Sequence, residues 1–265
     1  MQSMEFEPRT LGRTGLRVGR LGAAASYGVP ASAVERAVEH GVNYLYWGSM
    51  RRSGFRDAIR HLAPRRERLV IVLQSYSRIA PLIGWSVERG LRAGRLEYAD
   101  ILLLGLWNKP VPERILDACR ALRERGMVRF LAVSSHNRRL VPELAAGRDF
   151  DVVHFRYNAA HPGAEVDIFP RLPATNAGMV AYTATSWGQL LKPAKALPGE
   201  RVPAASDCYR FVLTRPEVDV CLSGPANAAQ MDEALKALRR GPMDDEELAW
   251  MRRVGAGVRG RGTRQ

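Results

Sequence analysis

Lysine, cysteine and long apolar runs are scarce in this chain of 265 residues. The three cysteines, Cys119, Cys208 and Cys221, are too few and too scattered for a disulfide framework or a cysteine-based metal site. No apolar run reaches the roughly 18 residues that a membrane span needs. The acidic, polar start MQSMEFEPRT does not resemble a secretory signal. We therefore expect a cytoplasmic protein without a metal site or a membrane partner.

Basic charge is abundant, but it is almost all arginine. Only four of the 40 basic residues are lysine, and the 27 acidic residues leave a net charge of +13. The arginines are spread along the whole chain, whereas a nucleic-acid binder is expected to gather them on one face or stripe. We therefore do not expect a nucleic-acid partner, and residues 1–265 are interpreted as one domain. The arginine- and glycine-rich residues 252–265 are interpreted as a frayed basic tail.

Short apolar runs alternate with amphipathic stretches from about residue 18 onward. The apolar runs predict strands at residues 21–25, 43–47, 69–75, 101–106, 128–134, 151–156, 179–183 and 218–222. Helical periodicity lies between most of them, as at residues 32–40, 54–62, 79–93, 112–125 and 138–146. Such alternation predicts parallel strands joined by right-handed helical crossovers.

Eight strands in this arrangement favour an α/β fold of the closed (β/α)8 TIM-barrel type. A doubly wound open sheet is the competing fold, but the first strand ends in LGAAASYG and lacks its G-x-G-x-x-G fingerprint. Residues 8–20 predict an N-terminal β-hairpin that turns at Arg13–Gly15 and covers the barrel floor. Residues 244–257 begin with acidic and end with basic side chains, which predicts an extra C-terminal helix. The segment 189–204 has no periodicity and is expected to be a loop.

Six short segments along the chain carry a further signal. They are LGRTGLRVGRLG at 11–22, GVNY at 41–44, YADILLLG at 98–105, RGMVRFLAVSS at 125–135, RYNAAHPGAE at 156–165 and VDVCLSGPANAAQMDEALKAL at 218–238. Each segment alone is weakly specific, but in this order and at these intervals they resemble the aldo-keto reductase superfamily over most of the chain. The resemblance implies a barrel that binds NADP or NAD and reduces a carbonyl compound.

The four catalytic positions of the family carry different residues in this chain. The family's Asp falls on Tyr46, its Tyr on Arg51 or a neighbour, its Lys on Gln74 and its His on Gly105. No lysine precedes Lys109, so a small shift of the alignment does not restore the set. A tyrosine of pKa about 10 needs a nearby cation to donate a proton easily near neutrality. The resemblance therefore predicts a divergent member with a non-standard proton donor.

Much of the family's nucleotide site has a counterpart in this chain. The resemblance places Ser134 and Ser135 at the carboxamide, with His154 where the family has Gln, and Tyr182 against the nicotinamide ring. Predicted phosphate and ribose contacts are Thr183, Thr185, Ser186, Gly188, Ser223, Gly224, Asn227 and Gln230. The basic residue that the family often uses for the 2′-phosphate of NADP is missing between Val218 and Leu235. The choice between NAD and NADP therefore stays open.

Polar and aromatic side chains at the predicted strand ends supply the catalytic candidates. We predict Tyr46 as the proton donor, with Tyr76 and His136 as alternatives, and expect Trp47, Gln74, Trp107 and Asn108 to contact substrate. Each candidate also has a structural interpretation. Aromatic residues such as Tyr46 and Trp47 fill volume in a barrel more often than they catalyse, and His136 is equally typical of a solvated loop.

Three functions are consistent with this pattern. The leading hypothesis is an NADP- or NAD-dependent oxidoreductase acting on a small-molecule carbonyl substrate. The second is a catalytically silent barrel that senses a nucleotide or binds a protein partner. The third is a cofactor-free lyase or isomerase that uses the polar barrel mouth. The sequence does not determine the substrate or the oligomeric state.

Overall fold

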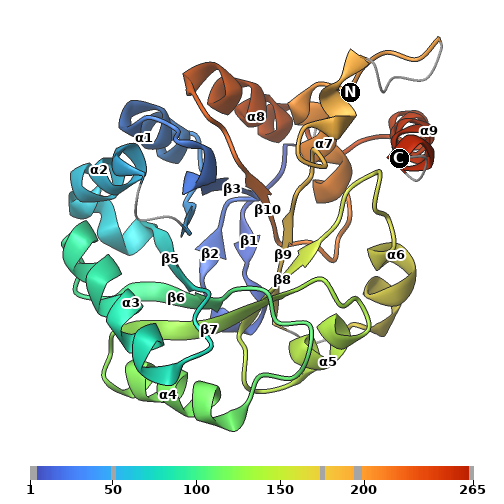
Figure 1. Cartoon of the computed structure of the whole chain (residues 1–265). Helices are drawn as coiled ribbons and strands as arrows, with labels where there is room; N and C mark the ends of the chain where they lie inside the picture. Colours follow the sequence, from blue (N-terminus) through green and yellow to red (C-terminus); the bar gives the residue numbers. More distant parts are fainter. Residues whose placement is uncertain (1–4, 49–51, 174–176, 194–198, 263–265) are drawn as a thin grey trace.

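Eight parallel strands form a closed barrel in the computed structural model, which describes residues 5–48, 52–173, 177–193 and 199–262 (Figure 1). The strand order around the barrel is β10-β3-β4-β5-β6-β7-β8-β9, so each strand pairs with its neighbour in sequence and β10 closes onto β3. The bounds are β3 Leu21–Ala24, β4 Tyr44–Trp47, β5 Val70–Ser75, β6 Ala99–Leu104, β7 Val128–Ser135, β8 Val152–Arg156, β9 Gly178–Tyr182 and β10 Val220–Ser223. The TIM-barrel prediction is confirmed.

The two faces of each strand bury different sets of side chains, as the period of two in a strand requires. On β5, Val70 and Val72 belong to the cluster inside the barrel. Ile71 and Leu73 belong instead to the larger cluster between the strands and the helices. Strands that are apolar on both faces are what a parallel sheet covered by helices needs.

Side-chain oxygens of Asn and Asp fix the register where several strands begin. Asn43 Oδ1 accepts the Gly19 N–H at 2.9 Å, and Asp100 Oδ2 accepts the Ile71 N–H at 2.8 Å. Asp151 and Asp219 make the same bond to N–H groups of β7 and β9. Asp100 is fully buried, and Arg66 and Arg129 neutralise it. Some of the arginines therefore stabilise the end of the barrel at which the strands begin.

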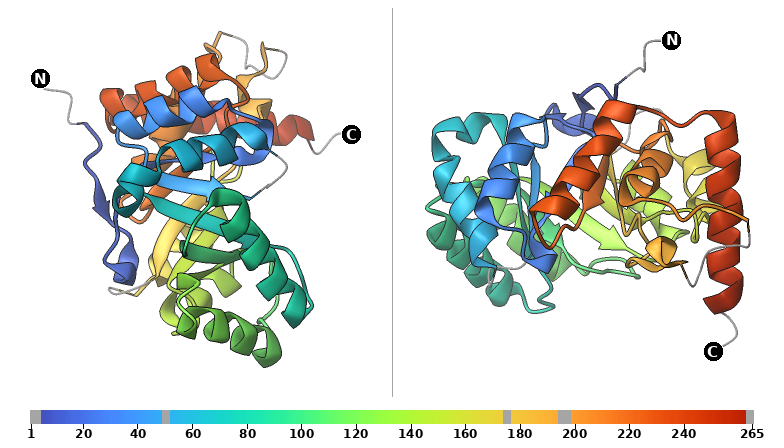
Figure 2. Two further views of the ribbon diagram at one scale, coloured as in Figure 1. Left: turned by 90° about the vertical axis from the view of Figure 1, so that its left-hand side faces the viewer. Right: turned by 90° about the horizontal axis from the view of Figure 1, so that it is seen from above.

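Helices surround the barrel, as Figure 2 shows in two further views. Their bounds are α1 Ala31–Glu39, α2 Ser53–His61, α3 Ala80–Gly94, α4 Glu113–Glu124, α5 Leu140–Ala146, α6 Ala164–Asp167, α7 Ala205–Leu213, α8 Ala228–Arg240 and α9 Asp245–Gly262. Short 3-10 turns lie at Ala25–Tyr27 (η2), Ala63–Arg68 (η3), Phe169–Arg171 (η4) and Gln189–Leu191 (η5). No helix of the described part of the chain combines the length and the apolar character that crossing a membrane demands.

The predicted N-terminal hairpin consists of β1 Arg9–Thr10 and β2 Arg17–Val18, joined through the 3-10 turn η1 Gly12–Thr14. Leu11 and Val18 belong to the cluster inside the barrel. A β-carbon at Gly12 would overlap the backbone of Gly178 at the start of β9, so only glycine permits this close approach. The hairpin therefore closes the end of the barrel at which the strands begin, as predicted.

Two sequence predictions at the C-terminal side need correction. Residues 252–262, expected to be a frayed tail, continue helix α9, and Arg252 and Arg253 bond Glu165 and Glu200 at 2.7 Å. The segment 189–204, expected to be a loop, begins with the 3-10 turn η5, and helix α7, which periodicity did not reveal, follows it from Ala205. Nearly every residue of α7 is buried, including Asp207 and Arg210, so the helix has no solvent-exposed face.

Two strands end earlier than predicted because the backbone turns left-handed. Leu106 has φ 51° and Thr183 has φ 60°, and neither value fits an extended strand. Strand β6 therefore ends at Leu104 and β9 at Tyr182.

Candidate functional site

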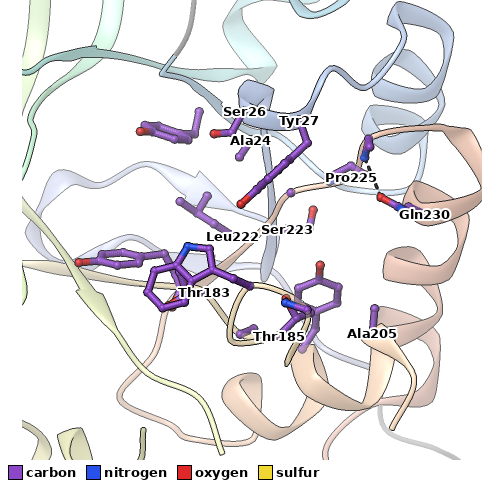
Figure 3. Close-up of a pocket in the computed structure, with 18 of the residues that line it drawn as sticks. Ala24, Ser26, Tyr27, Thr183, Thr185, Ala205, Leu222, Ser223, Pro225 and Gln230 are labelled. Carbon is purple, nitrogen blue, oxygen red and sulfur yellow. Dashed lines mark hydrogen bonds between the residues drawn. The ribbon is translucent and has the colours of Figure 1, made fainter. Parts of the chain in front are cut away.

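A large cavity opens at the carboxyl ends of the strands, the end at which barrel enzymes place their active sites. Its volume is about 770 Å³, within the range of about 300–1,000 Å³ that is typical of small-molecule sites. In Figure 3, Tyr27 lies on one wall of this cavity, and Thr183 and Thr185 lie on another. Among the described residues that line the cavity there is no lysine or arginine.

Most of the site residues predicted from the sequence meet in this cavity. The lining includes Tyr46, Gln74, Tyr76, Ser134, His136, His154, Tyr182, Thr183, Thr185, Gly188, Ser223, Gly224 and Gln230. They come from the ends of β4, β5, β7, β8, β9 and β10 and from helix α8. Their position agrees with the sequence prediction, while their individual roles stay predictions.

Both tryptophans predicted to contact substrate lie outside the cavity. Trp47 is 1% exposed and packs in the layer between the strands and the helices, near Gly94 of α3. Its neighbour Tyr46 points inward, and alternation along β4 sends Trp47 to the opposite face. Trp107 is also buried, and the Arg78 guanidinium carbon lies 3.7 Å from its ring centroid. The prediction that Trp47 and Trp107 form a substrate wall is wrong.

Four polar residues of the predicted set also lie outside the cavity, because their side chains or backbones shape loops. Asn108 Oδ1 accepts the His136 N–H at 2.8 Å and the Ser135 hydroxyl at 3.3 Å. Ser186 is buried within a turn at φ 51°. Asn227 caps helix α8 by accepting the Gln230 N–H at 3.0 Å. Direct substrate or cofactor contact by Asn108, Ser135, Ser186 or Asn227 is therefore not what the geometry supports. Arg51 lies outside the described residues.

A hydroxyl–amide cluster occupies one end of the cavity. The Tyr46 hydroxyl donates a hydrogen bond to Gln74 Oε1 and lies beside the Tyr76 hydroxyl. Burial raises the pKa of Tyr46, the neighbouring Tyr76 raises it further, and the Gln74 contact lowers it. Tyr46 is thus a weak acid, which holds its proton until a strongly basic oxygen comes within reach. Tyr76 is 63% exposed, so it connects the cluster to solvent.

The floor of the cavity holds a second polar pair. His154 Nε2 lies 2.8 Å from the Tyr44 hydroxyl, and both side chains are buried inside the barrel. Burial lowers the pKa of His154 to about 3, so the imidazole is neutral at pH 7. His154 also lines the cavity, so a neutral imidazole held by Tyr44 forms part of its floor.

Tyr182 and His136 flank the cavity beside this floor. Their ring centroids are 5.8 Å apart, and the Tyr182 hydroxyl donates to the Ser135 carbonyl at 3.3 Å. Ser134 lines the cavity while its Oγ accepts the Leu106 N–H at 2.7 Å, so its own hydroxyl proton is available to a ligand. Flat aromatic surface and nearby hydroxyl donors suit a heteroaromatic ring with an amide substituent.

The far end of the cavity is built from a loop and two helix starts. In the loop after β9, Thr185 Oγ1 accepts the Gly188 N–H at 3.2 Å and keeps its own proton for donation. At the start of α8, Gln230 Oε1 accepts the Ala226 N–H at 2.8 Å, a bond drawn in Figure 3. Residues 203–205 bring the start of α7 to the same end. Helix N-termini and hydroxyl donors suit phosphate oxygens.

Sequence reasoning overlooked several cavity residues. Tyr27 follows β3 in the turn η2, and a β-carbon at Gly224 would overlap its ring, so glycine lets Tyr27 approach β10. Residues 203–205 were hidden in a segment without periodicity. The position of Tyr27 at the carboxyl end of the first barrel strand was a usable signal. No signal existed for residues 203–205, because only packing of α7 against α8 brings them to the cavity.

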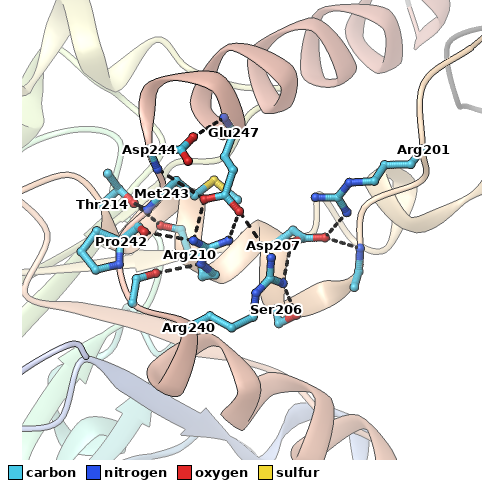
Figure 4. Close-up of polar contacts among 12 residues, drawn as sticks. Arg201, Ser206, Asp207, Arg210, Thr214, Arg240, Pro242, Met243, Asp244 and Glu247 are labelled. Atoms are coloured by element: carbon cyan, nitrogen blue, oxygen red, sulfur yellow. Dashed lines mark hydrogen bonds and ion pairs between the residues drawn. The ribbon is translucent and has the colours of Figure 1, made fainter. Parts of the chain in front are cut away.

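A buried ionic network holds α7 against α8 and α9 (Figure 4). Arg210 is 4% exposed and bonds Glu247 Oε2 at 2.6 Å, the Gly241 carbonyl at 2.8 Å and the Pro242 carbonyl at 3.0 Å. Asp207 is also buried, and its carboxylate pairs with Arg201 at 2.8 Å and with Arg240 at 2.7 Å. Because α7 and α8 both start at the cavity, this network fixes the far end of the site.

The fold and the site define a (β/α)8 barrel with a large cavity at the carboxyl ends of its strands. A model of the aldo/keto reductase family matches residues 30–207, and the chain belongs to that family. This membership places the chain among oxidoreductases. No curated protein matches the sequence significantly.

The solved structures similar in fold include two aldo-keto reductases. AKR11C1 from Bacillus halodurans in its holo form has a TM-score of 0.76 and 18% identity, over 94% of this chain and 96% of that one. An aldo/keto reductase from Klebsiella pneumoniae, solved with NADP and acetate, has a TM-score of 0.74 and 20% identity, over 92% and 94%. At such identities the likeness shows the fold alone.

The described ranges contain no group of three or more His, Cys, Asp or Glu side chains that could hold a metal ion.

Proposed function

We propose that the chain is an oxidoreductase that uses NADH or NADPH to reduce a small carbonyl compound. Its proposed proton donor is a tyrosine hydroxyl at a different position from the family's usual tyrosine. The observation that carries this proposal is a single cavity with a hydroxyl–amide cluster at one end and helix starts at the other. Family membership and the NADP-bound neighbour from Klebsiella pneumoniae support the cofactor class.

The cavity suits a nicotinamide dinucleotide in shape and in donors. Tyr182 offers the aromatic face for the nicotinamide ring, and Ser134 and His154 offer polar atoms for its carboxamide. Thr185 and Gly188, together with the start of α8, are placed for the phosphates. When bound, the reduced nicotinamide supplies the hydride that the carbonyl carbon accepts.

The protein then has to deliver one proton to the carbonyl oxygen. Tyr46 is our first candidate because its hydroxyl lies at the cavity end and is held by Gln74. As negative charge develops on the substrate oxygen, that oxygen becomes basic enough to take a proton from a tyrosine of raised pKa. Tyr76, exposed beside it, returns a proton to Tyr46 from solvent.

His136 is the weaker candidate for the donor. Burial and the charge of Arg156 lower the pKa of His136, so the imidazole is mostly neutral at pH 7. A neutral imidazole holds its remaining proton far more tightly than an imidazolium does, so it is a poor acid. Its ring also lies beside Tyr182 rather than in the Tyr46 cluster.

Titration with NADH and NADPH, followed by a panel of aldehydes, tests the proposal. Trp187 lines the cavity and is 55% exposed, so dinucleotide binding is expected to quench its fluorescence. Trp187→Phe is the control that identifies the reporter. We expect Tyr46→Phe to keep the binding and to lose at least about a hundredfold in turnover, the lower end of the range for removing a positioned acid. Equal turnover in Tyr46→Phe would reject Tyr46 as the donor.

A dinucleotide-sensing barrel without turnover is the second candidate. It is favoured by the lack of a lysine or arginine in the described cavity lining, since a cation beside a tyrosine is what lowers its pKa. Micromolar binding of NADH or NADPH without oxidation of the cofactor by any aldehyde would support this alternative. Binding of neither dinucleotide would contradict both candidates and leave the cofactor-free lyase or isomerase.

A further inference from the structure

A small hollow lies beside the main cavity and shares His136 with it. Its volume is about 10 Å³, room for about one water-sized group. Two arginines, Arg138 and Arg156, and two histidines, His136 and His161, lie in its lining, which contains no carboxylate among the described residues. The hollow therefore brings positive charge to the mouth of a cavity whose own described lining has none.

Arg156 owes its place to the alternation along β8. Val152 packs inside the barrel, and His154 reaches the cavity floor from the same face. Arg156, two residues further, shares this inward face at the end of the strand, and it is in register with Tyr182 of β9. Arg156 lines the small hollow beside His136, which also lines the main cavity.

The acidic side chains near Arg156 are already engaged. Asp167 bonds Arg138 at 2.6 Å. Glu165 bonds Arg252 at 2.7 Å and accepts the Tyr157 hydroxyl at 2.6 Å. Within the described part of the chain, Arg156 makes no ion pair. A permanently charged guanidinium without a counter-charge at a cavity mouth attracts anionic ligands.

The pKa values of the two histidines in the hollow reflect the same excess of positive charge. Burial lowers the pKa of His136, and Arg156 lowers it further. Burial also lowers the pKa of His161, with added effects from Arg156, Arg259 and Arg138. An anion bound between these groups would oppose each of the arginine effects.

We propose that Arg156 binds an anionic group of the substrate, a carboxylate in the simplest case, and so selects carbonyl compounds that carry one. This inference rests on the proposed function, because it assigns the substrate class of the same site. The substrate's carbonyl would lie near Tyr46, and its carboxylate would extend across the mouth toward the ends of β7 and β8. Arg156 is thus a specificity-determining residue, not a proton donor.

The first arm of the test measures binding without turnover. Terephthalate carries no reducible carbonyl, and it is titrated into the purified protein at constant pH while the C2–H NMR signals of the histidines are followed. We expect the His136 and His161 signals to move in the wild type and to move far less in Arg156→Gln. Arg139→Gln is the matched control, since it removes one exposed arginine that does not line the hollow. Equal shifts in Arg156→Gln and the wild type would overturn the proposal.

The second arm compares 4-carboxybenzaldehyde with its uncharged methyl ester, methyl 4-formylbenzoate. A charge-assisted hydrogen bond to guanidinium is worth roughly a factor of 10–100 in binding. We therefore expect Arg156→Gln to lower the ratio of kcat/KM for the acid to that for the ester by about tenfold or more. An unchanged ratio overturns the proposal, and so does an equal loss for both aldehydes with a raised KM for NADH, since Arg156 would then bind the cofactor.

The two arms separate failure of the inference from failure of the proposed function. Terephthalate shifts that depend on Arg156, without reduction of either aldehyde, support the anion site and reject the reductase. Reduction of both aldehydes at rates that do not depend on Arg156 supports the reductase and rejects the anion site.

Discussion

The ring of Tyr76 lies against Gly105, and a β-carbon at Gly105 would overlap ring atoms Cδ1 and Cε1 of Tyr76. The resemblance to the family had aligned a catalytic histidine with this glycine. Tyr76 occupies the space that any larger side chain at position 105 would need, so the two positions are coupled. Gly105 follows β6 and Tyr76 follows β5, and the Tyr76 ring fills the space that the missing side chain of Gly105 leaves at the barrel mouth.

Gly105→Ala is therefore expected to displace Tyr76 and to lower turnover. Because Tyr76 is 63% exposed, its ring can shift toward solvent, and the free energy of unfolding should change by less than about 1 kcal/mol, below the cost of overpacking a closed core. Gly84→Ala is the control, because a β-carbon there meets only Leu122, at 4.0 Å. It should keep full activity and gain up to about 1 kcal/mol of helix stability. Activity of Gly105→Ala equal to that of the wild type would remove Tyr76 from the mechanism.

Acid should destabilise the fold through His154. Its pKa is about 3 when folded and about 6.5 when unfolded, so the unfolded state binds more protons between these values. The stabilisation is present above pH 6.5 and is lost as pH falls. Between pH 7 and pH 5, His154 should account for a loss of about 2 kcal/mol in the free energy of unfolding. Urea unfolding of wild type and His154→Gln at both pH values measures this share. His40→Gln, at an exposed site after α1, must keep the wild-type pH dependence.

Arg210→Met should destabilise the protein by about 3 kcal/mol, because it leaves Glu247 and two carbonyls without their buried partner. Affinity for a dinucleotide should fall with it, since α7 and α8 both start at the cavity. Urea unfolding and Trp187 quenching give the two readouts. Arg36→Gln breaks an exposed pair with Asp232 and should cost less than about 1 kcal/mol. Similar losses in both variants would argue against the network.

Gln230→Arg should shift the cofactor preference toward NADPH by roughly tenfold, the size of one added charge-assisted hydrogen bond. Glu233 also lines this end of the cavity and pairs with Lys236 at 2.8 Å, so the wild type presents no free cation there among its described residues. Gln230→Met is the matched control, because it loses the same bond to the Ala226 N–H without adding charge. An equal gain for NADH and NADPH would show that position 230 does not face the ribose.

The barrel was predictable because its signal is local and repeated. Strands apolar on both faces recur between amphipathic helices, and each unit carries the same information about parallel pairing. The N-terminal hairpin and helix α9 were predicted from turn and end signals. Helix α7 was not predicted: it is only nine residues long, and its polar residues Asp207 and Arg210 are buried in an ionic network instead of forming a solvent-facing stripe.

The sequence predicted which strand ends form the candidate site. It did not always predict which way each side chain points. Tyr46 and Trp47 are neighbours in sequence, yet Tyr46 reaches the cavity and Trp47 packs behind the barrel wall. Alternation along β4 sends them to opposite faces, and a shift of one residue in the predicted strand exchanges them. The cytoplasmic location and the absence of a nucleic-acid partner stay predictions from composition.

The sequence by itself determined the fold and the family, because each depends on residue types at fixed intervals. Only the tertiary structure decided which polar groups meet. The Tyr46–Gln74 bond, the Tyr44–His154 pair and the position of Arg156 beside His136 join different strands. Their geometry depends on the register in which the barrel closes, which side-chain packing sets across the whole ring of strands.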